Sequence, residues 1–278
     1  MNAREMIRKA AASLREAGVP DPEYDSALLL SSLMGIPPLE LRMGTEIHPD
    51  PQQEEAYGRL IQRRRSREPL QYILGTVYFR GMEFQVSPEV LIPRPETELL
   101  AEWAAEEMQG RPSPEILDVC CGSGCLGLSM KRALPGGKVT LSDLSPGAVR
   151  IARLNRDRQG LEAEILQGDL LEPVAGRRFD LILCNPPYIP SRDCEELQPE
   201  VMREPRLALD GGADGMDFFR RLSGKCPAYL KPGGLLMMEV GIGEAREAAR
   251  MLREHGAVRA EIRKDDSQIE RMVLGAYA

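Results

Sequence analysis

ILDVCCGSGCLGLSM (116–130) is the segment that indicates the architecture of this 278-residue chain most directly. It begins as an apolar strand, turns through Gly122-x-Gly124-x-x-Gly127 and continues with helical spacing. Glycines at such a turn let the backbone bend sharply and approach a ligand, whose polar groups meet free N–H groups at the helix start. Asp143 ends the next expected strand, where a carboxylate can bind ribose hydroxyls. The pattern predicts a ribose-containing cofactor without selecting one.

Asp118 narrows the choice of cofactor. With Cys120, Gly122 and Gly124 it forms a run that resembles the acid-x-Gly-x-Gly-x-Gly pattern of class I S-adenosylmethionine (SAM) methyltransferases. A carboxylate close to this turn would stabilise the cationic sulfonium and amino groups of SAM. The sequence departs from the pattern at Cys120, and we expect a small residue with negative φ to replace that glycine.

Two residues after the third expected strand extend the cofactor hypothesis. Asp169 and Leu170 lie in QGDLLEP (167–173). The acid could accept a hydrogen bond from the adenine amino group, while the apolar neighbour covers the ring. Gly-Asp after a strand is also common in simple turns, so both interpretations stay open.

LILCNPPYI (181–189) places Asn-Pro-Pro-Tyr directly after an apolar strand. The prolines fix φ and restrict the residue before them, which makes the loop rigid. It can therefore present the Asn185 amide oxygen and the Pro186 carbonyl as preset acceptors for a planar –NH2 group. Tyr188 can pack against a flat acceptor. This predicts attack of an amine or amide nitrogen on the sulfonium methyl, with catalysis mostly by positioning.

The rest of the second half alternates strands with helices, which favours a doubly wound parallel sheet. The expected strands are residues 115–119, 138–142, 163–166, 180–184 and 235–240, and the expected helices are 124–134, 146–158, 214–222 and 243–254. The last segments, 258–263 and 271–277, resemble a strand pair. We therefore expect an antiparallel strand at or near one edge of the sheet.

The first part of the chain has a different pattern. Residues 1–70 carry apolar side chains at helical spacing and predict a small helical bundle. In residues 71–90, β-formers that include Tyr72 and Leu74 alternate with glycines and predict a β-hairpin linker. The basic cluster QRRRSRE (62–68) is either a solvated helix end or a contact for an anionic partner.

The composition of the chain limits which partners it can bind and in which cellular compartment we expect it. With 36 Lys+Arg against 43 Asp+Glu, the net charge of −7 argues against stable nucleic-acid binding, which depends on neutralising phosphates. We find neither a run long and apolar enough for a membrane span nor a signal peptide, and expect a cytoplasmic protein. The six cysteines form no CxxC and the two histidines are distant, so we expect reduced packing cysteines and no metal site.

The whole chain resembles the release-factor glutamine N5-methyltransferases. The matching segments are EPLQYILG (68–75), LIPRPETE (91–98), SDLSPGAV (142–149), GDLLEP (168–173), NPPYI (185–189), REPRLALDGGADGMDFFRRL (203–222) and GGLLMMEVG (233–241). The resemblance implies a Rossmann-like catalytic domain over residues 91–278 that transfers a methyl group from SAM to the GGQ glutamine of class I peptide-chain release factors. It also implies that residues 1–70 recognise the protein substrate.

Functional roles in the family can be assigned to residues of this chain by their position in the shared motifs. The resemblance and the motifs together assign SAM binding to Asp118, Cys120, Cys121, Gly122, Ser123, Gly124, Asp143, Asp169, Leu170 and Asn185. They assign glutamine binding to Asn185, Pro186, Pro187 and Tyr188, and catalysis to Asn185, Pro186 and Tyr188. The chain departs from the family in VGIGEA (240–245), which lacks a glutamine often found there. The Gly-rich segment 210–215 is either an ordinary loop or a mobile cover over the acceptor.

Two other functions share parts of these motifs. NPPY also occurs in enzymes that methylate adenine N6 or guanine N2 in nucleic acid, although the acidic balance favours a protein amide. The GxGxxG spacing alone would also suit a Rossmann dehydrogenase or a non-catalytic binding module.

Overall fold

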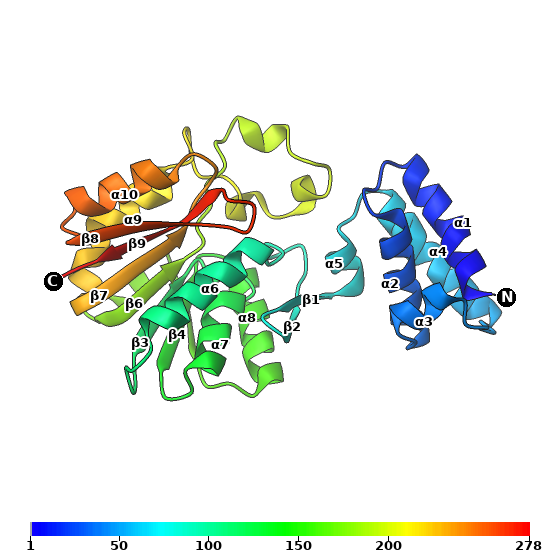
Figure 1. The fold of residues 1–278 in the computed structure, drawn as a ribbon, viewed down its shortest axis with the longest axis horizontal. Helices are drawn as coiled ribbons and strands as arrows, with labels where there is room; N and C mark the ends of the chain where they lie inside the picture. The colour runs from blue at the N-terminus through cyan, green and yellow to red at the C-terminus, as the bar shows by residue number, and fades with distance from the viewer. Residues whose placement is uncertain (1) are drawn as a thin grey trace. The chain divides into compact units, whose positions relative to one another are not determined.

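The computed structural model describes residues 2–278 and divides into two units (Figure 1). The first unit contains residues 2–75 together with residues 198–203. The second contains residues 76–197 and 204–278.

The first unit is a helical bundle. Its helices are α1 (Ala3–Glu16), α2 (Pro22–Met34), α3 (Pro38–Met43), α4 (Pro51–Arg65) and α5 (Leu70–Leu74). Each longer helix buries one apolar stripe, and the side chains of Leu14, Leu29, Leu30 and Leu41 are fully buried where these stripes meet. Asp50 and Gln53 form a capping box at the start of α4, which satisfies backbone N–H groups that a helix leaves free.

Helix α5 corrects the expected linker. Tyr72 and Leu74 lie in a short helix rather than in a strand. Pro69 precedes this helix and Gly75 ends it with φ 78°, a left-handed conformation that glycine adopts freely. Burial of Ile73 in the helical core decides the outcome, because β-propensity over four residues is weak beside packing.

The basic cluster of α4 binds carboxylates of the chain itself. Arg64 is 5% exposed and donates from Nε to Asp25 at 2.7 Å and from Nη1 to Glu200 at 2.9 Å. Arg67 donates two further hydrogen bonds to Glu200, at 2.7 and 2.6 Å. The expectation of a solvated helix end is therefore wrong for Arg64 and Arg67. An arginine is stable in a buried position only where carboxylates compensate its charge. Residues 198–203 supply one of these carboxylates, Glu200.

The second unit is built on a seven-stranded sheet of order β5-β4-β3-β6-β7-β9-β8. Its strands are β3 (Glu115–Val119), β4 (Lys138–Asp143), β5 (Glu164–Gln167), β6 (Phe179–Cys184), β7 (Leu230–Glu239), β8 (Arg259–Lys264) and β9 (Glu270–Ala276). Neighbouring strands from β5 to β7 are parallel, and β9 pairs antiparallel with both β7 and β8. This confirms the predicted doubly wound sheet with an antiparallel C-terminal strand. A separate hairpin, β1 (Thr76–Phe79) and β2 (Met82–Gln85), precedes it.

Helices cover both faces of this sheet (Figure 1). Helices α6 (Pro95–Glu107), α7 (Cys125–Ala133) and α8 (Pro146–Gln159) pack on one face, and α9 (Asp217–Lys225) and α10 (Ala245–Glu254) on the other. Short 3-10 helices span Glu172–Val174, Asp193–Glu195, Val201–Arg203, Arg206–Ala208 and Cys226–Tyr229. Among residues 2–278, no helix combines the length and apolar character that a membrane crossing requires.

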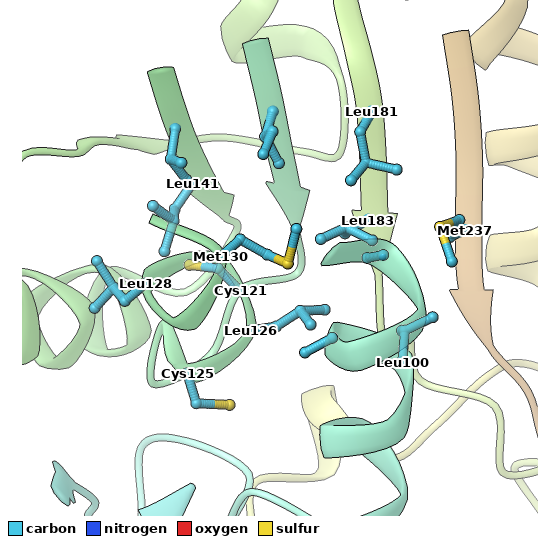
Figure 2. Close-up of a cluster of buried hydrophobic side chains, with 14 of the residues drawn as sticks. Leu100, Cys121, Cys125, Leu126, Leu128, Met130, Leu141, Leu181, Leu183 and Met237 are labelled. Atoms are coloured by element: carbon cyan, nitrogen blue, oxygen red, sulfur yellow. The ribbon is translucent and has the colours of Figure 1, made fainter. Parts of the chain in front are cut away.

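The strands of the central sheet alternate between the two cores. Leu181 and Leu183 of β6 join the core under α6 and α7, whereas Ile182 and Cys184 join the core under α9 and α10. Figure 2 shows Leu181 and Leu183 directed toward the helical side that carries Leu100 and Leu126. This two-residue alternation explains why the central strands read as continuous apolar runs: both faces are buried.

Candidate active site

A cavity opens at the carboxyl ends of the parallel strands. The strand order reverses between β3 and β6, and ligands of doubly wound folds bind at such a reversal. The cavity is lined by Glu89, Val90, Leu91, Cys120, Gly122, Asp143, Leu144, Ser145, Ala148, Asp169, Leu170, Asn185, Pro187, Pro205, Leu207, Ala208, Phe218 and Arg221. Seven of the residues that sequence reasoning selected therefore meet here: Cys120, Gly122, Asp143, Asp169, Leu170, Asn185 and Pro187.

The glycine loop between β3 and α7 turns through three residues with positive φ. Gly122 and Gly124 have φ 53° and 80°, and Cys120 has φ 58°. The expected negative φ at Cys120 is wrong: the cysteine adopts a left-handed conformation, which costs a residue with a Cβ about 1–2 kcal/mol. A Cβ on Gly122 would meet no atom within 4 Å, so this position leaves the wall of the cavity open to a ligand.

Asp143 joins the end of β4 to the glycine loop. Its Oδ2 accepts from the Gly122 N–H at 2.8 Å, and its Oδ1 accepts from the Ser145 N–H at 2.9 Å. Burial raises the pKa of Asp143, while these backbone hydrogen bonds lower it. Each oxygen keeps a lone pair, so the carboxylate can also accept from hydroxyls of a ligand in the cavity.

Asp118 lies behind the cavity rather than in its wall. It is 1% exposed, and its Oδ2 accepts from the N–H of Gly127 in α7 at 2.8 Å. Burial raises the pKa of Asp118 to about 7. A Cβ on Gly127 would lie 2.9 Å from the Asp118 side chain, so the third glycine allows α7 to pack closely on β3. The contact made by Asp118 is structural, and its predicted role toward SAM stays a prediction.

Three further predicted cofactor residues lie outside the lining set: Cys121, Ser123 and Gly124. Cys121 is buried in the core beneath α7 (Figure 2). A Cβ on Gly124 would come within 3.2–3.3 Å of Leu128, Leu141 and Ala152, so this glycine serves the packing of the turn. These three residues were selected because the family pattern runs through the whole loop. In the structure, Cys120 and Gly122 of this loop line the cavity, and the residues beside them face the core.

Asp169 and Leu170 lie in the loop that follows β5. Leu170 has φ 49°, and both residues line the cavity. The Asp169 carboxylate accepts from Arg221 of α9, whose guanidinium lies 5.8 Å from the centre of the Phe218 ring. Sequence reasoning missed Phe218 and Arg221. They lie in the recognised segment 203–222, but no local pattern there indicates that α9 reaches the cavity.

The NPPY loop gives the site an unusual acceptor. Asn185 donates from Nδ2 to Thr97 Oγ1 at 3.0 Å. Its Oδ1 is buried and has no hydrogen-bond partner among the described residues. Pro187 lines the cavity with Asn185, whereas Pro186 and Tyr188 lie outside the lining set. Thr97, which sequence reasoning also missed, belongs to the recognised segment 91–98.

The Gly-rich segment 210–215 packs against the backbone of the NPPY loop. The Ile189 N–H donates to Leu209 O at 2.9 Å, and the Gly211 N–H donates to Ile189 O at 2.8 Å. A Cβ on Gly211 would lie 2.7 Å from both Tyr188 Cα and Gly215 O. Only glycine fits there, so the segment supports the acceptor loop from behind.

A further missed feature is the carboxylate of Glu204. It is 5% exposed, and it accepts from the Ile92 N–H at 3.0 Å and from the Arg94 guanidinium. These hydrogen bonds connect two segments of the chain. One begins at Glu204 and continues through Pro205, Leu207 and Ala208, and the other follows Leu91. Both segments contribute to the cavity wall, and both belong to stretches that the sequence identified only by resemblance.

Comparison with known proteins agrees with this geometry. A family model described as the methyltransferase small domain matches residues 96–238, and one described as the PrmC N-terminal domain matches residues 5–75. A methyltransferase from Pyrococcus furiosus shares the fold, with a TM-score of 0.53 at 16% identity, over 71% of this chain and 89% of that one. The second unit is thus a SAM-dependent methyltransferase domain.

Relatives of nearly equal length define the family. The release factor glutamine methyltransferase of Geobacter sulfurreducens is 42% identical over 264 residues, covering 94% of this chain and 92% of that protein. The protein of the same name from Deinococcus radiodurans is 41% identical over 280 residues, covering 100% and 99%. The chain belongs to the release factor glutamine methyltransferase family, which confirms the resemblance found in the sequence.

Proposed function

We propose that this protein transfers the methyl group of SAM to the side-chain amide nitrogen N5 of the GGQ glutamine in class I peptide-chain release factors. The observation that carries the proposal is the buried Oδ1 of Asn185, which has no partner among the described residues. Leaving a buried acceptor unpaired costs about 1–3 kcal/mol, so a rigid loop that maintains one is suited to a donor that arrives with a ligand. The –NH2 group of glutamine is such a donor.

The residues at the carboxyl ends of the strands fit SAM. Asp143 would accept from the ribose hydroxyls, while Asp169 and Leu170 would contact the adenine. Gly122 would leave room for the ligand beside the glycine loop, because a Cβ there would point into open space. When bound, SAM supplies a methyl group activated by a sulfonium. Asp118, Cys121, Ser123 and Gly124 would then act by holding the loop in shape.

The NPPY loop would orient the acceptor nitrogen. Asn185 Oδ1 and the Pro186 carbonyl would each accept one N–H of the glutamine amide and direct the nitrogen lone pair toward the methyl group. These hydrogen bonds strengthen as positive charge develops on nitrogen, so they stabilise the transition state more than the bound substrate. Pro187 would complete the wall around the amide, while Tyr188 would hold the end of the loop through its hydroxyl.

Recognition of the release factor would involve the helical unit. The family resemblance assigns residues 1–70 to substrate recognition, residues 71–90 to a linker and residues 91–278 to catalysis. The family model over residues 5–75 supports a distinct N-terminal domain. In this proposal the helical unit would bind the folded release factor, while the catalytic unit would bind SAM and the glutamine side chain.

Asn185→Ala tests the assigned chemistry. We expect the turnover number for a release factor to fall by about 10²-fold or more, because the variant removes an acceptor that acts mainly in the transition state. SAM affinity, measured by calorimetry, should change much less. Gln109→Ala, at an exposed position after α6, is the control and should leave both values unchanged. Turnover by Asn185→Ala equal to that of the wild type would refute the role of Asn185.

A further inference from the structure

Strand β7 ends in a carboxylate that the proposed reaction does not use. Glu239 is fully buried, at 0% exposed, and lies outside the residues that line the cavity. Its Oε2 accepts from Thr97 Oγ1 at 2.6 Å, and its Oε1 accepts from Tyr188 Oη at 3.2 Å. Glu239 therefore contacts one residue of the NPPY loop directly and reaches another, Asn185, through Thr97.

One cation compensates the buried charge. Arg271 of β9 lies 3.7 Å from Glu239 Oε1, and it donates to Tyr188 Oη at 3.1 Å. Its guanidinium also lies 5.4 Å from the centre of the Tyr188 ring. Burial raises the pKa of Glu239, and Glu96 raises it further, whereas Thr97, Arg271 and Tyr188 lower it. Two hydroxyl donors and one guanidinium thus face this carboxylate and oppose the effect of burial on its pKa.

The single proton of Thr97 fixes the direction of the hydrogen bonds. The Thr97 hydroxyl donates this proton to Glu239 Oε2. The hydroxyl then has only lone pairs left for Asn185, and only the –NH2 end of the Asn185 amide can face them. The other end, Oδ1, is thereby left free. The chemistry of the chain thus decides the orientation of an amide that would otherwise be free to flip.

We propose that Glu239 is a positioning residue for methyl transfer, which acts through Thr97 to hold the Asn185 amide with Oδ1 free for the substrate. The inference rests on the proposed function, since it assigns the means by which the acceptor loop is prepared. Donation from Nδ2 to a hydroxyl that itself donates to a carboxyl group also polarises the Asn185 amide and makes Oδ1 a stronger acceptor. The contact with Tyr188 fixes the far end of the same loop.

Two substitutions of Thr97 separate this role from packing. Thr97 is 3% exposed. Thr97→Val keeps the shape and removes the hydroxyl, whereas Thr97→Ser keeps the hydroxyl and removes a methyl group. With a purified release factor and SAM, we expect Thr97→Val to lower kcat roughly five- to tenfold, the effect of one hydrogen bond. Thr97→Ser should stay within about twofold of the wild type, and KM for SAM should change little in both variants. The opposite order, with Ser the more damaging, would show a packing role and overturn the proposal.

A second measurement does not depend on activity. In ¹⁵N-labelled protein, the Asn185 side-chain –NH2 should show one proton shifted downfield and slowed in exchange with water. This signal should persist in Thr97→Ser and disappear in Thr97→Val. An Asn185 signal that is identical in the wild type and Thr97→Val would overturn the proposal. Glu239→Gln should also weaken the shift of this Asn185 proton, and an unchanged signal in that variant would overturn the role of Glu239. If the wild type methylates no release factor, the proposed function fails, and the Asn185 signals of these variants still decide whether Glu239 and Thr97 orient the amide.

Discussion

Replacing Asp118 by asparagine should change how the stability of the catalytic unit depends on pH. The carboxyl group is 1% exposed, and its pKa is about 7 in the folded protein compared with an ordinary 3.8. Between these pH values the folded chain keeps a proton that the unfolded chain releases. The contribution of Asp118 to stability is therefore complete below pH 3.8 and is lost as the pH rises toward 7.

The size of the effect follows from the two pKa values. At about 1.4 kcal/mol for each tenfold change in proton affinity, the wild type should lose roughly 4 kcal/mol relative to Asp118→Asn between pH 4 and pH 8. The asparagine is neutral throughout, and its Oδ1 can still accept from the Gly127 N–H. At pH 8 the variant should therefore be the more stable protein.

Urea unfolding without SAM measures this difference. Trp103 is the only tryptophan of the chain and is 1% exposed on α6, so its fluorescence reports on the catalytic unit. Asp157→Asn, at an exposed position of α8, is the control and should change the free energy of unfolding by less than about 0.5 kcal/mol. A difference between wild type and Asp118→Asn that is the same at pH 5 and pH 8 would show that folding does not raise the pKa of Asp118.

Three other substitutions test separate parts of the structure. Asp143→Ala should weaken SAM binding by about 10- to 100-fold in calorimetry, since a charged acceptor is removed; equal affinity would contradict the ribose assignment. Gly211→Ala places a Cβ 2.7 Å from Tyr188 Cα and should lower kcat at least about tenfold with a smaller change in SAM affinity; normal turnover would show that the loop is not held from behind. Asp25→Ala leaves the buried Arg64 with one carboxylate fewer and should destabilise the helical unit by about 3 kcal/mol, measured by circular dichroism during urea unfolding; no change would show that Glu200 alone is sufficient.

Local patterns were enough to predict the parallel sheet and the loops at its carboxyl ends. Fully buried strands and helix starts leave strong traces in a sequence, because burial and capping restrict residue types at fixed spacing. The short helix α5 was missed because Tyr72 and Leu74 suit a strand equally well over so few residues. Its identity follows from packing in the helical core, which the sequence alone does not display.

The network behind the acceptor loop could not be predicted in the same way. Thr97, Asn185, Glu239 and Arg271 come from different elements and meet only after the sheet has formed. Thr97 and Glu239 do lie in segments recognised by resemblance, LIPRPETE and GGLLMMEVG, but nothing in either segment names its partner. Likewise, no pattern indicated that Cys120 adopts a left-handed conformation.

Mass spectrometry of a class I release factor after incubation with this protein and SAM tests the central proposal most directly. We expect one added methyl group on the glutamine of the GGQ motif, and no transfer to a release factor in which that glutamine is replaced. Methylation retained by the replaced release factor, or found on a nucleic acid instead, would contradict it.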